Sequence, residues 1–130
     1  MNVAGDRDGA RALLERLWED GGDAQQRCWI AHYLADLQGS VAEELRWDEI
    51  AMAAFRELGD DGDRALLPSL HLNLADVHRR AGNASEARRH LAEAAAGLGA
   101  LPAGDYGDLI RGALEQVSAR IDAGSAEPLT

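Results

Sequence analysis

The chain holds four histidines and a single cysteine, and these side chains have the greatest capacity for chemistry. Cys28 lies four residues before His32, a spacing that places both side chains on one face of a helix. A neighbouring histidine could stabilise the thiolate of Cys28 and make it a nucleophile. Cys28 also falls on an apolar stripe, however, and the pattern favours its interpretation as a small core residue.

The remaining histidines are His71, His78 and His90. His71 and His78 are seven residues apart, or about two turns along one helical face, and His90 falls on another predicted helix. A zinc site typically takes more closely spaced pairs or additional cysteine ligands, so the pattern favours packing histidines. The sequence also lacks a phosphate-binding loop, a dinucleotide fingerprint and a Gly-x-Ser-x-Gly elbow. We therefore predict no metal, no cofactor and no catalytic residues.

These three histidines lie in the stretch with the strongest helical periodicity, from Pro68 to Leu98. Gly82 is suited to the left-handed conformation that ends a helix, and Asn83 or Ser85 is suited to cap the next one. The stretch therefore predicts two amphipathic helices joined by a tight turn. Apolar residues recur at three- and four-residue spacing, first at Leu70, Leu74, Val77 and Ala81 and then at Ala87, Leu91, Ala94 and Leu98.

Four further helices are predicted from apolar stripes and from glycine breaks. Gly59–Asp63 is a polar break, and we expect Met1–Gly5 and the tail after Gly124 to be loose. Because short loops favour antiparallel neighbours, we predict an all-α chain of about six helices in antiparallel pairs, forming a single domain over residues 1–130. The additional helices are expected from Asp6 or Asp8 to Glu19, from Ala24 to Leu37, from Ala42 to Leu58, and from Asp105 or Asp108 to about residue 123.

The stretch Pro68–Gly99 resembles the tetratricopeptide repeat (TPR), a pair of helices with small residues where the helices approach each other. His71 and His78 stand where the family usually has a tryptophan and a tyrosine. The matching residues are Leu74-Ala75 in the first helix, Gly82 at the turn, and Ala87, Leu91 and Ala94 in the second helix.

A divergent copy of the repeat covers Ala24–Leu58, and residues 105–123 resemble a terminal capping helix. The resemblance implies an α-α superhelix, with an irregular helical bundle as the alternative architecture.

In the TPR family, the first helix of each repeat lines a concave groove. Stacking of the two copies would place His32 near Asp76 and Asp36 near Arg80. Two interpretations of these residues stay open, a polar groove that grips a peptide and a set of structural salt bridges between helices. The resemblance implies a partner-binding groove formed by Trp29, His32, Asp36, Ser69, Leu72, Asn73, Asp76, Arg79 and Arg80.

Composition excludes several classes of partner. The net charge of −10 disfavours nucleic acid, which binds through neutralised phosphates. No apolar run approaches the ~18–20 residues of a membrane span, and no signal peptide is evident, so a membrane partner is not expected. The lone cysteine fits a reducing cytoplasm. Arginine is the only cationic residue besides histidine, and this usage, rich in alanine and glycine, is associated with high-GC bacterial sequences.

We predict from these observations a non-catalytic protein–protein interaction module of the TPR type, whose partner is a protein or peptide. One alternative is a helical domain that forms a homodimer through uncovered end faces. The other is a small enzyme that uses His32 and Asp76.

Overall fold

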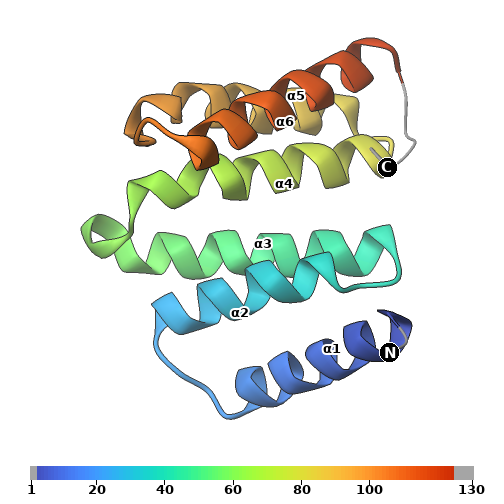
Figure 1. Cartoon of the computed structure of the whole chain (residues 1–130), viewed down its shortest axis with the longest axis vertical. Coiled ribbons are helices and arrows are strands. Elements are labelled where there is room, and N and C mark those ends of the chain that lie inside the picture. The colour runs from blue at the N-terminus through green and yellow to red at the C-terminus, as the bar shows by residue number, and fades with distance from the viewer. Residues whose placement is uncertain (1–2, 125–130) are drawn as a thin grey trace. The chain divides into compact units, whose positions relative to one another are not determined.

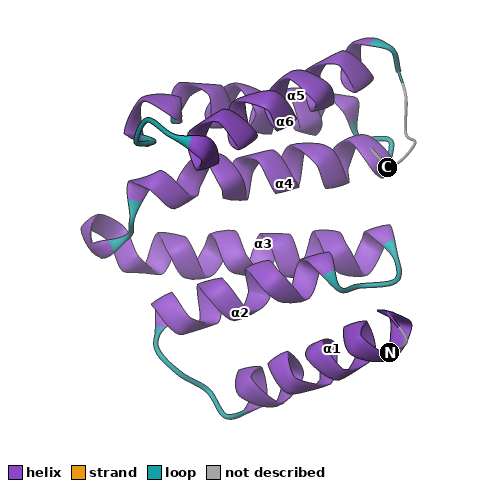
Figure 2. Cartoon of the chain, in the orientation of Figure 1, coloured by secondary structure: helices purple, strands orange, loops and turns teal. Residues whose placement is uncertain are grey.

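The computed structural model describes residues 3–124, and its regular structure is entirely helical over this range (Figures 1 and 2). The prediction of an all-α chain with about six helices is confirmed. None of the described helices is long and apolar enough to cross a membrane. The α-helices are α1 (Val3–Glu19), α2 (Ala24–Asp36), α3 (Val41–Leu58), α4 (Leu67–Arg80), α5 (Ala84–Ala96) and α6 (Asp105–Asp122), and the short 3-10 helices are η1 (Gly59–Asp61), η2 (Arg64–Leu66) and η3 (Leu98–Ala100).

The helices belong to two compact units, which meet in the sequence between Gly62 and Asp63. The first unit contains α1, α2 and α3, and the second contains α4, α5 and α6. The prediction of a single domain over residues 1–130, with a superhelical stacking of repeats, stays a prediction.

In the first unit, α2 begins at a complete capping box. The Asp23 side chain accepts a hydrogen bond from the Gln26 backbone N–H at 2.8 Å, and the Gln26 side chain accepts one from the Asp23 N–H at 3.1 Å. Two backbone donors at the helix N-terminus are thereby satisfied. Ser40 plays the same role for α3, because its hydroxyl accepts from the Glu43 N–H.

Replacement of the capping residue by Asp23→Ala is expected to lower the free energy of unfolding by about 1 kcal/mol, because the Gln26 N–H loses its acceptor. Urea denaturation followed by circular dichroism measures this loss. Asp20→Ala, just before the cap at an exposed position, is the matched control and should leave stability within about 0.5 kcal/mol of the wild type. Equal effects of the two changes would contradict the capping role.

The first unit is held together by the α2–α3 hairpin, on which α1 packs (Figure 1). Trp18 of α1 meets Trp47 of α3 edge to face, with ring centroids 5.1 Å apart. Arg7 donates to the carbonyl oxygens of Asp36 and Gln38 at 3.0 and 3.3 Å, so α1 also satisfies acceptors at the end of α2. The buried apolar side chains of α2 and α3 are Cys28, Ala31, Leu34, Ala35, Trp47, Ala51, Met52, Ala54 and Phe55.

The start of α1 differs from the prediction. Helix α1 begins at Val3 and not at a cap formed by Asp6 or Asp8, so Val3–Gly5 are helical and not loose. Residues 1–2 and 125–130, where loose ends were also expected, lie outside the described residues. The polar break after α3 contains the short helix η1, and η2 follows directly after it.

The second unit is built on the α4–α5 hairpin. Gly82 adopts a φ of +85°, as predicted, and the Asn83 N–H donates to the His78 carbonyl at 2.8 Å to close the end of α4. The prediction of a side-chain cap for α5 is wrong for Asn83, which makes no such bond. Its side-chain amide instead lies 3.3 Å from Nδ1 of His78.

Helix α6 packs against both α4 and α5. The small residues Ala75, Ala87 and Ala94 are fully buried in the core of this unit, where their size allows the helices to approach closely. Leu72 of α4 also lies in this core, 7% exposed. The remaining buried members are Leu101, Ile110, Leu114, Val117 and Ile121.

Candidate functional site

The predicted groove positions on α4 have different environments. Ser69 and Asn73 are half-buried. Leu72 belongs to the core with α6, so its side chain contributes to the hydrophobic core and is not open to a partner. The charged residues Asp76, Arg79 and Arg80 lie together on α4, and Arg79 is the most buried of the three.

These charged residues form an ion-pair network within one helix. Arg79 donates to Oδ1 of Asp76 through Nε and Nη2, at 3.1 and 2.8 Å. Arg80 donates from Nε to the other carboxylate oxygen at 3.0 Å. A carboxylate that accepts from two guanidinium groups is oriented by both of them, which supports a structural role for Asp76.

The predicted groove positions on α2 differ in burial. His32 is buried, whereas Trp29 and Tyr33 are 39% and 51% exposed, with their rings stacked at a centroid distance of 5.8 Å. Burial lowers the pKa of His32, and the negative charge of Asp36 opposes this effect. His32 is therefore neutral at pH 7.

The predicted pairs His32–Asp76 and Asp36–Arg80 each join a residue of the first unit to one of the second. These pairings stay predictions.

Cys28 does not have the properties of an activated nucleophile. Its side chain is buried, and burial raises the pKa of the thiol, so the protonated form dominates at pH 7. Its environment therefore supports the interpretation of Cys28 as a core residue.

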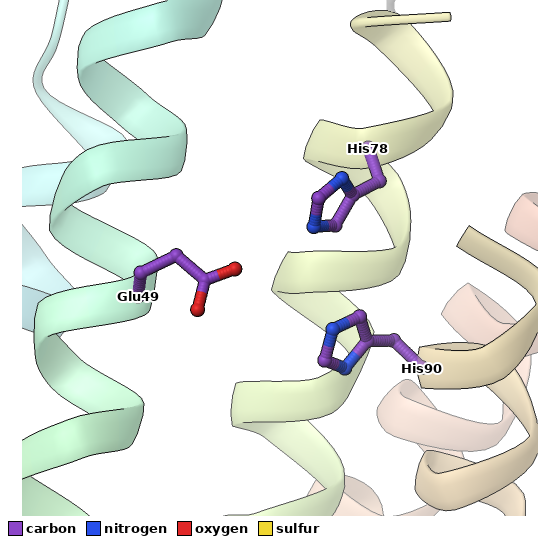
Figure 3. Close-up of side chains that lie close together, drawn as sticks. All are labelled: Glu49, His78 and His90. Atoms are coloured by element: carbon purple, nitrogen blue, oxygen red, sulfur yellow. The ribbon is translucent and has the colours of Figure 1, made fainter. Parts of the chain in front are cut away.

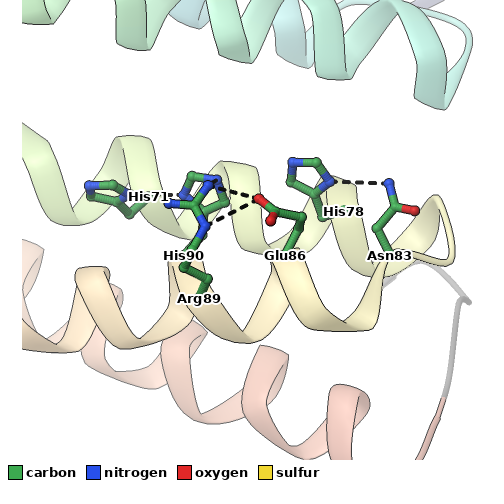
Figure 4. A network of polar contacts seen from close by, with 6 residues as sticks. All are labelled: His71, His78, Asn83, Glu86, Arg89 and His90. Atoms are coloured by element: carbon green, nitrogen blue, oxygen red, sulfur yellow. Dashed lines mark hydrogen bonds and ion pairs between the residues drawn. The ribbon is translucent and has the colours of Figure 1, made fainter.

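Three histidines of the second unit form a cluster, His71 and His78 of α4 and His90 of α5. All three rings are buried. Nδ1 of His71 and Nδ1 of His90 lie 3.0 Å apart, within hydrogen-bonding distance (Figure 4). His78 stacks on His90, with the ring planes 8° from parallel and the centroids 5.5 Å apart (Figure 3).

Hydrogen-bond partners determine the tautomers in this cluster. Arg89 can only donate, and its Nη2 lies 3.2 Å from Nε2 of His90, which must therefore be the acceptor. His90 then carries its proton on Nδ1 and donates it to Nδ1 of His71. His71 in turn carries its proton on Nε2. Arg89 also pairs with Glu86 at 2.7 Å, which balances its charge beside the cluster (Figure 4).

The charge state of the cluster follows from this environment. Burial, together with the neighbouring Arg89, His71 and His78, lowers the pKa of His90 to about 4 against the opposing charge of Glu86. His90 is therefore neutral at pH 7, and it can act as a donor, an acceptor or a metal ligand. A ring with so low a pKa is poorly suited to exchange protons near neutral pH, so His90 is better suited to binding than to acid–base catalysis.

Sequence reasoning placed His71 and His78 on one helix and His90 on another, and it missed that the three rings meet. A signal was present, because in an antiparallel hairpin residues at similar distances from the turn lie side by side. His90 is eight residues after Gly82, while His78 and His71 are four and eleven residues before it. His90 therefore falls between the other two along the hairpin.

Comparison of the chain with protein-family models, with curated proteins and with solved structures gives no match.

Proposed function

We propose that this protein is a non-catalytic interaction module of the TPR type that binds a protein or peptide in a reducing cytoplasm. The observation that carries the proposal is the exposed aromatic pair, Trp29 and Tyr33, on α2. Stacked aromatic rings offer a large, rigid contact area at a low cost in conformational entropy, which is why such residues concentrate at binding hot spots.

A surface groove adjoins the aromatic pair and extends its apolar area. The groove has a volume of about 420 Å³ and runs between α1 and α2. Leu17 contributes an exposed apolar side chain on one side, and Trp29 and Ile30 line the other. The polar edge is supplied by Gln25 and Gln26, which can orient the backbone of a bound peptide by hydrogen bonds.

The TPR character of the module is supported by the second unit. The α4–α5 hairpin turns at Gly82, and the small positions Ala75, Ala87 and Ala94 are fully buried, as the family pattern requires. Helix α6 covers the hairpin in the manner expected of a capping helix.

The test is selection of a displayed random peptide library on the intact chain. Enriched peptides should bind the Trp29→Ala/Tyr33→Ala variant at least about 30-fold more weakly, because removal of a hot-spot aromatic typically costs about 2 kcal/mol or more. Titration of synthetic peptides, followed by calorimetry, gives the affinities.

Tyr106→Ala is the matched control, since Tyr106 is an exposed aromatic residue of the second unit. It should leave peptide affinity unchanged. The proposal fails if no peptide is enriched, or if the enriched peptides bind the double variant as tightly as the wild type.

A homodimer is the second candidate, and it is favoured by Leu13 and Leu17. These side chains are exposed one turn apart on α1 and could pair with a second copy. Light scattering over a concentration series distinguishes the two candidates, because a monomer at the highest concentration excludes a stable dimer.

A further inference from the structure

We propose that the second unit binds a divalent transition-metal ion through Nδ1 of His71 and Nδ1 of His90. The ion is one that prefers imidazole nitrogen, such as Zn²⁺ or Ni²⁺, over one that prefers oxygen, such as Mg²⁺.

The geometry of the two nitrogen atoms supports this site. They converge to 3.0 Å from two different helices. With zinc–nitrogen bonds of about 2.0–2.1 Å, two nitrogens on a tetrahedral ion lie about 3.3 Å apart. A separation of the two nitrogens by a few tenths of an ångström, together with a rotation of both rings toward a common point, therefore converts the hydrogen-bonded pair into a ligand pair.

The charge of the chain also suits a cation. The net charge of −10 favours the approach of a metal ion.

Metal binding requires one change of tautomer. His71 already carries its proton on Nε2, which leaves the lone pair of Nδ1 available to the ion. His90 carries its proton on Nδ1, and this proton must move to Nε2 so that Nδ1 can bind. The ring then stays neutral, and the contact between Nε2 and Arg89 is lost, while Arg89 keeps its ion pair with Glu86.

This exchange gives the proposal a distinctive consequence for Arg89. Replacing it by glutamine removes the positive charge beside His90, which opposes the approach of a metal cation. Arg89→Gln is therefore expected to tighten metal binding severalfold, although Arg89 is no ligand.

The experiment titrates the full chain with Zn²⁺ and Ni²⁺, with Mg²⁺ as the negative control, and follows the thermal midpoint Tm and the heat of binding. Zn²⁺ and Ni²⁺ at saturation should raise Tm by about 5 °C or more, whereas Mg²⁺ should not. Long-range ¹H–¹⁵N spectra should show the His90 proton on Nδ1 before addition of Zn²⁺ and on Nε2 afterwards.

Phenylalanine substitutions identify the ligands, because they keep an aromatic ring and remove the nitrogens. His71→Phe and His90→Phe should each weaken Zn²⁺ binding at least tenfold. His32→Phe, a buried histidine of the first unit, is the matched control and should leave the affinity within about threefold of the wild type. His78→Phe should also leave the affinity for Zn²⁺ within about threefold of the wild type, because His78 is not one of the two proposed ligands.

Several results would overturn the proposal. Zn²⁺ could fail to bind or to change Tm, or its binding could survive both His71→Phe and His90→Phe. A loss of binding in His78→Phe but not in His71→Phe would show that the assigned pair is wrong. If a phenylalanine variant does not fold, the tautomer change in the wild-type spectrum and the Arg89→Gln affinity decide the matter.

Discussion

Lowering the pH from 7 to about 4 is expected to reduce the free energy of unfolding by about 3 kcal/mol through His90 alone. The pKa of this ring falls from its ordinary value of 6.5 to about 4 in the folded protein, and each tenfold change in an acid dissociation constant corresponds to about 1.4 kcal/mol. Because His90 is only 2% exposed, solvent does little to screen the effect.

The direction of the change follows from the two pKa values. In the unfolded chain His90 takes up a proton near pH 6.5, whereas in the folded chain it does so only near pH 4. The unfolded state therefore binds more protons between these values. The contribution of the neutral His90 ring to stability is fully present above about pH 6.5 and is lost as the pH decreases toward 4. His32 acts in the same direction, since its pKa is also lowered in the folded state.

Urea denaturation at pH 7.5, 6.5, 5.5 and 4.5, followed by circular dichroism, measures this loss. The His90→Gln variant is the control, because glutamine does not titrate. Its unfolding should take up about one proton fewer over this range, so its free energy of unfolding should fall less as the pH decreases. In the wild type, the ring resonances of His90 should not titrate between pH 7 and 5. A titration near pH 6.5, or the same pH dependence in both proteins, would contradict the burial of a neutral ring.

The helices could be predicted from the sequence because their signals are local. Apolar periodicity marked α4 and α5, and the turn residue Gly82 and the cap Asp23 have the conformations and contacts that their chemistry suggests. The start of α1 could not be predicted, because Val3 carries no capping signal and the Arg7 contacts with the end of α2 are long-range.

The candidate sites were less predictable because they depend on which helices meet. Asn83 has the right chemistry for a cap, but its side chain lies against His78 instead. Its amide can bond to the backbone of α5 or to a nearby side chain, and the sequence does not distinguish the two. The histidine cluster depends on the close approach of α4 and α5. A 3.0 Å contact between two rings cannot be read from periodicity, which specifies a face of a helix and not the register of its neighbour.

Leu72 is the residue for which the repeat resemblance and the structure make different claims. The resemblance places it on the groove face of α4, whereas the structure places it in the core of the second unit with Val117 and other α6 residues. A groove leucine contributes little to stability, but a core leucine contributes both its transfer free energy and the packing of its surroundings.

Leu72→Ala is therefore expected to lower the free energy of unfolding by about 2–5 kcal/mol, because it leaves a cavity among α4, α5 and α6. Leu109→Ala is the matched control. Leu109 lies on α6 with 68% of its surface exposed, so its truncation should change stability by no more than about 0.5 kcal/mol. Denaturation at pH 7.5, followed by far-ultraviolet circular dichroism, compares the two variants with the wild type.

The outcome also bears on the binding surface. A large loss for Leu72→Ala means that α6 covers this position, so a partner of α4 must use the half-buried polar residues Ser69 and Asn73 or bind elsewhere, as the aromatic pair on α2 suggests. A loss below about 1 kcal/mol, similar to that of the control, would mean that α6 does not cover Leu72 in solution. The groove face of α4 would then be open, as in the TPR resemblance, and peptide affinity should fall in Leu72→Ala while stability is kept.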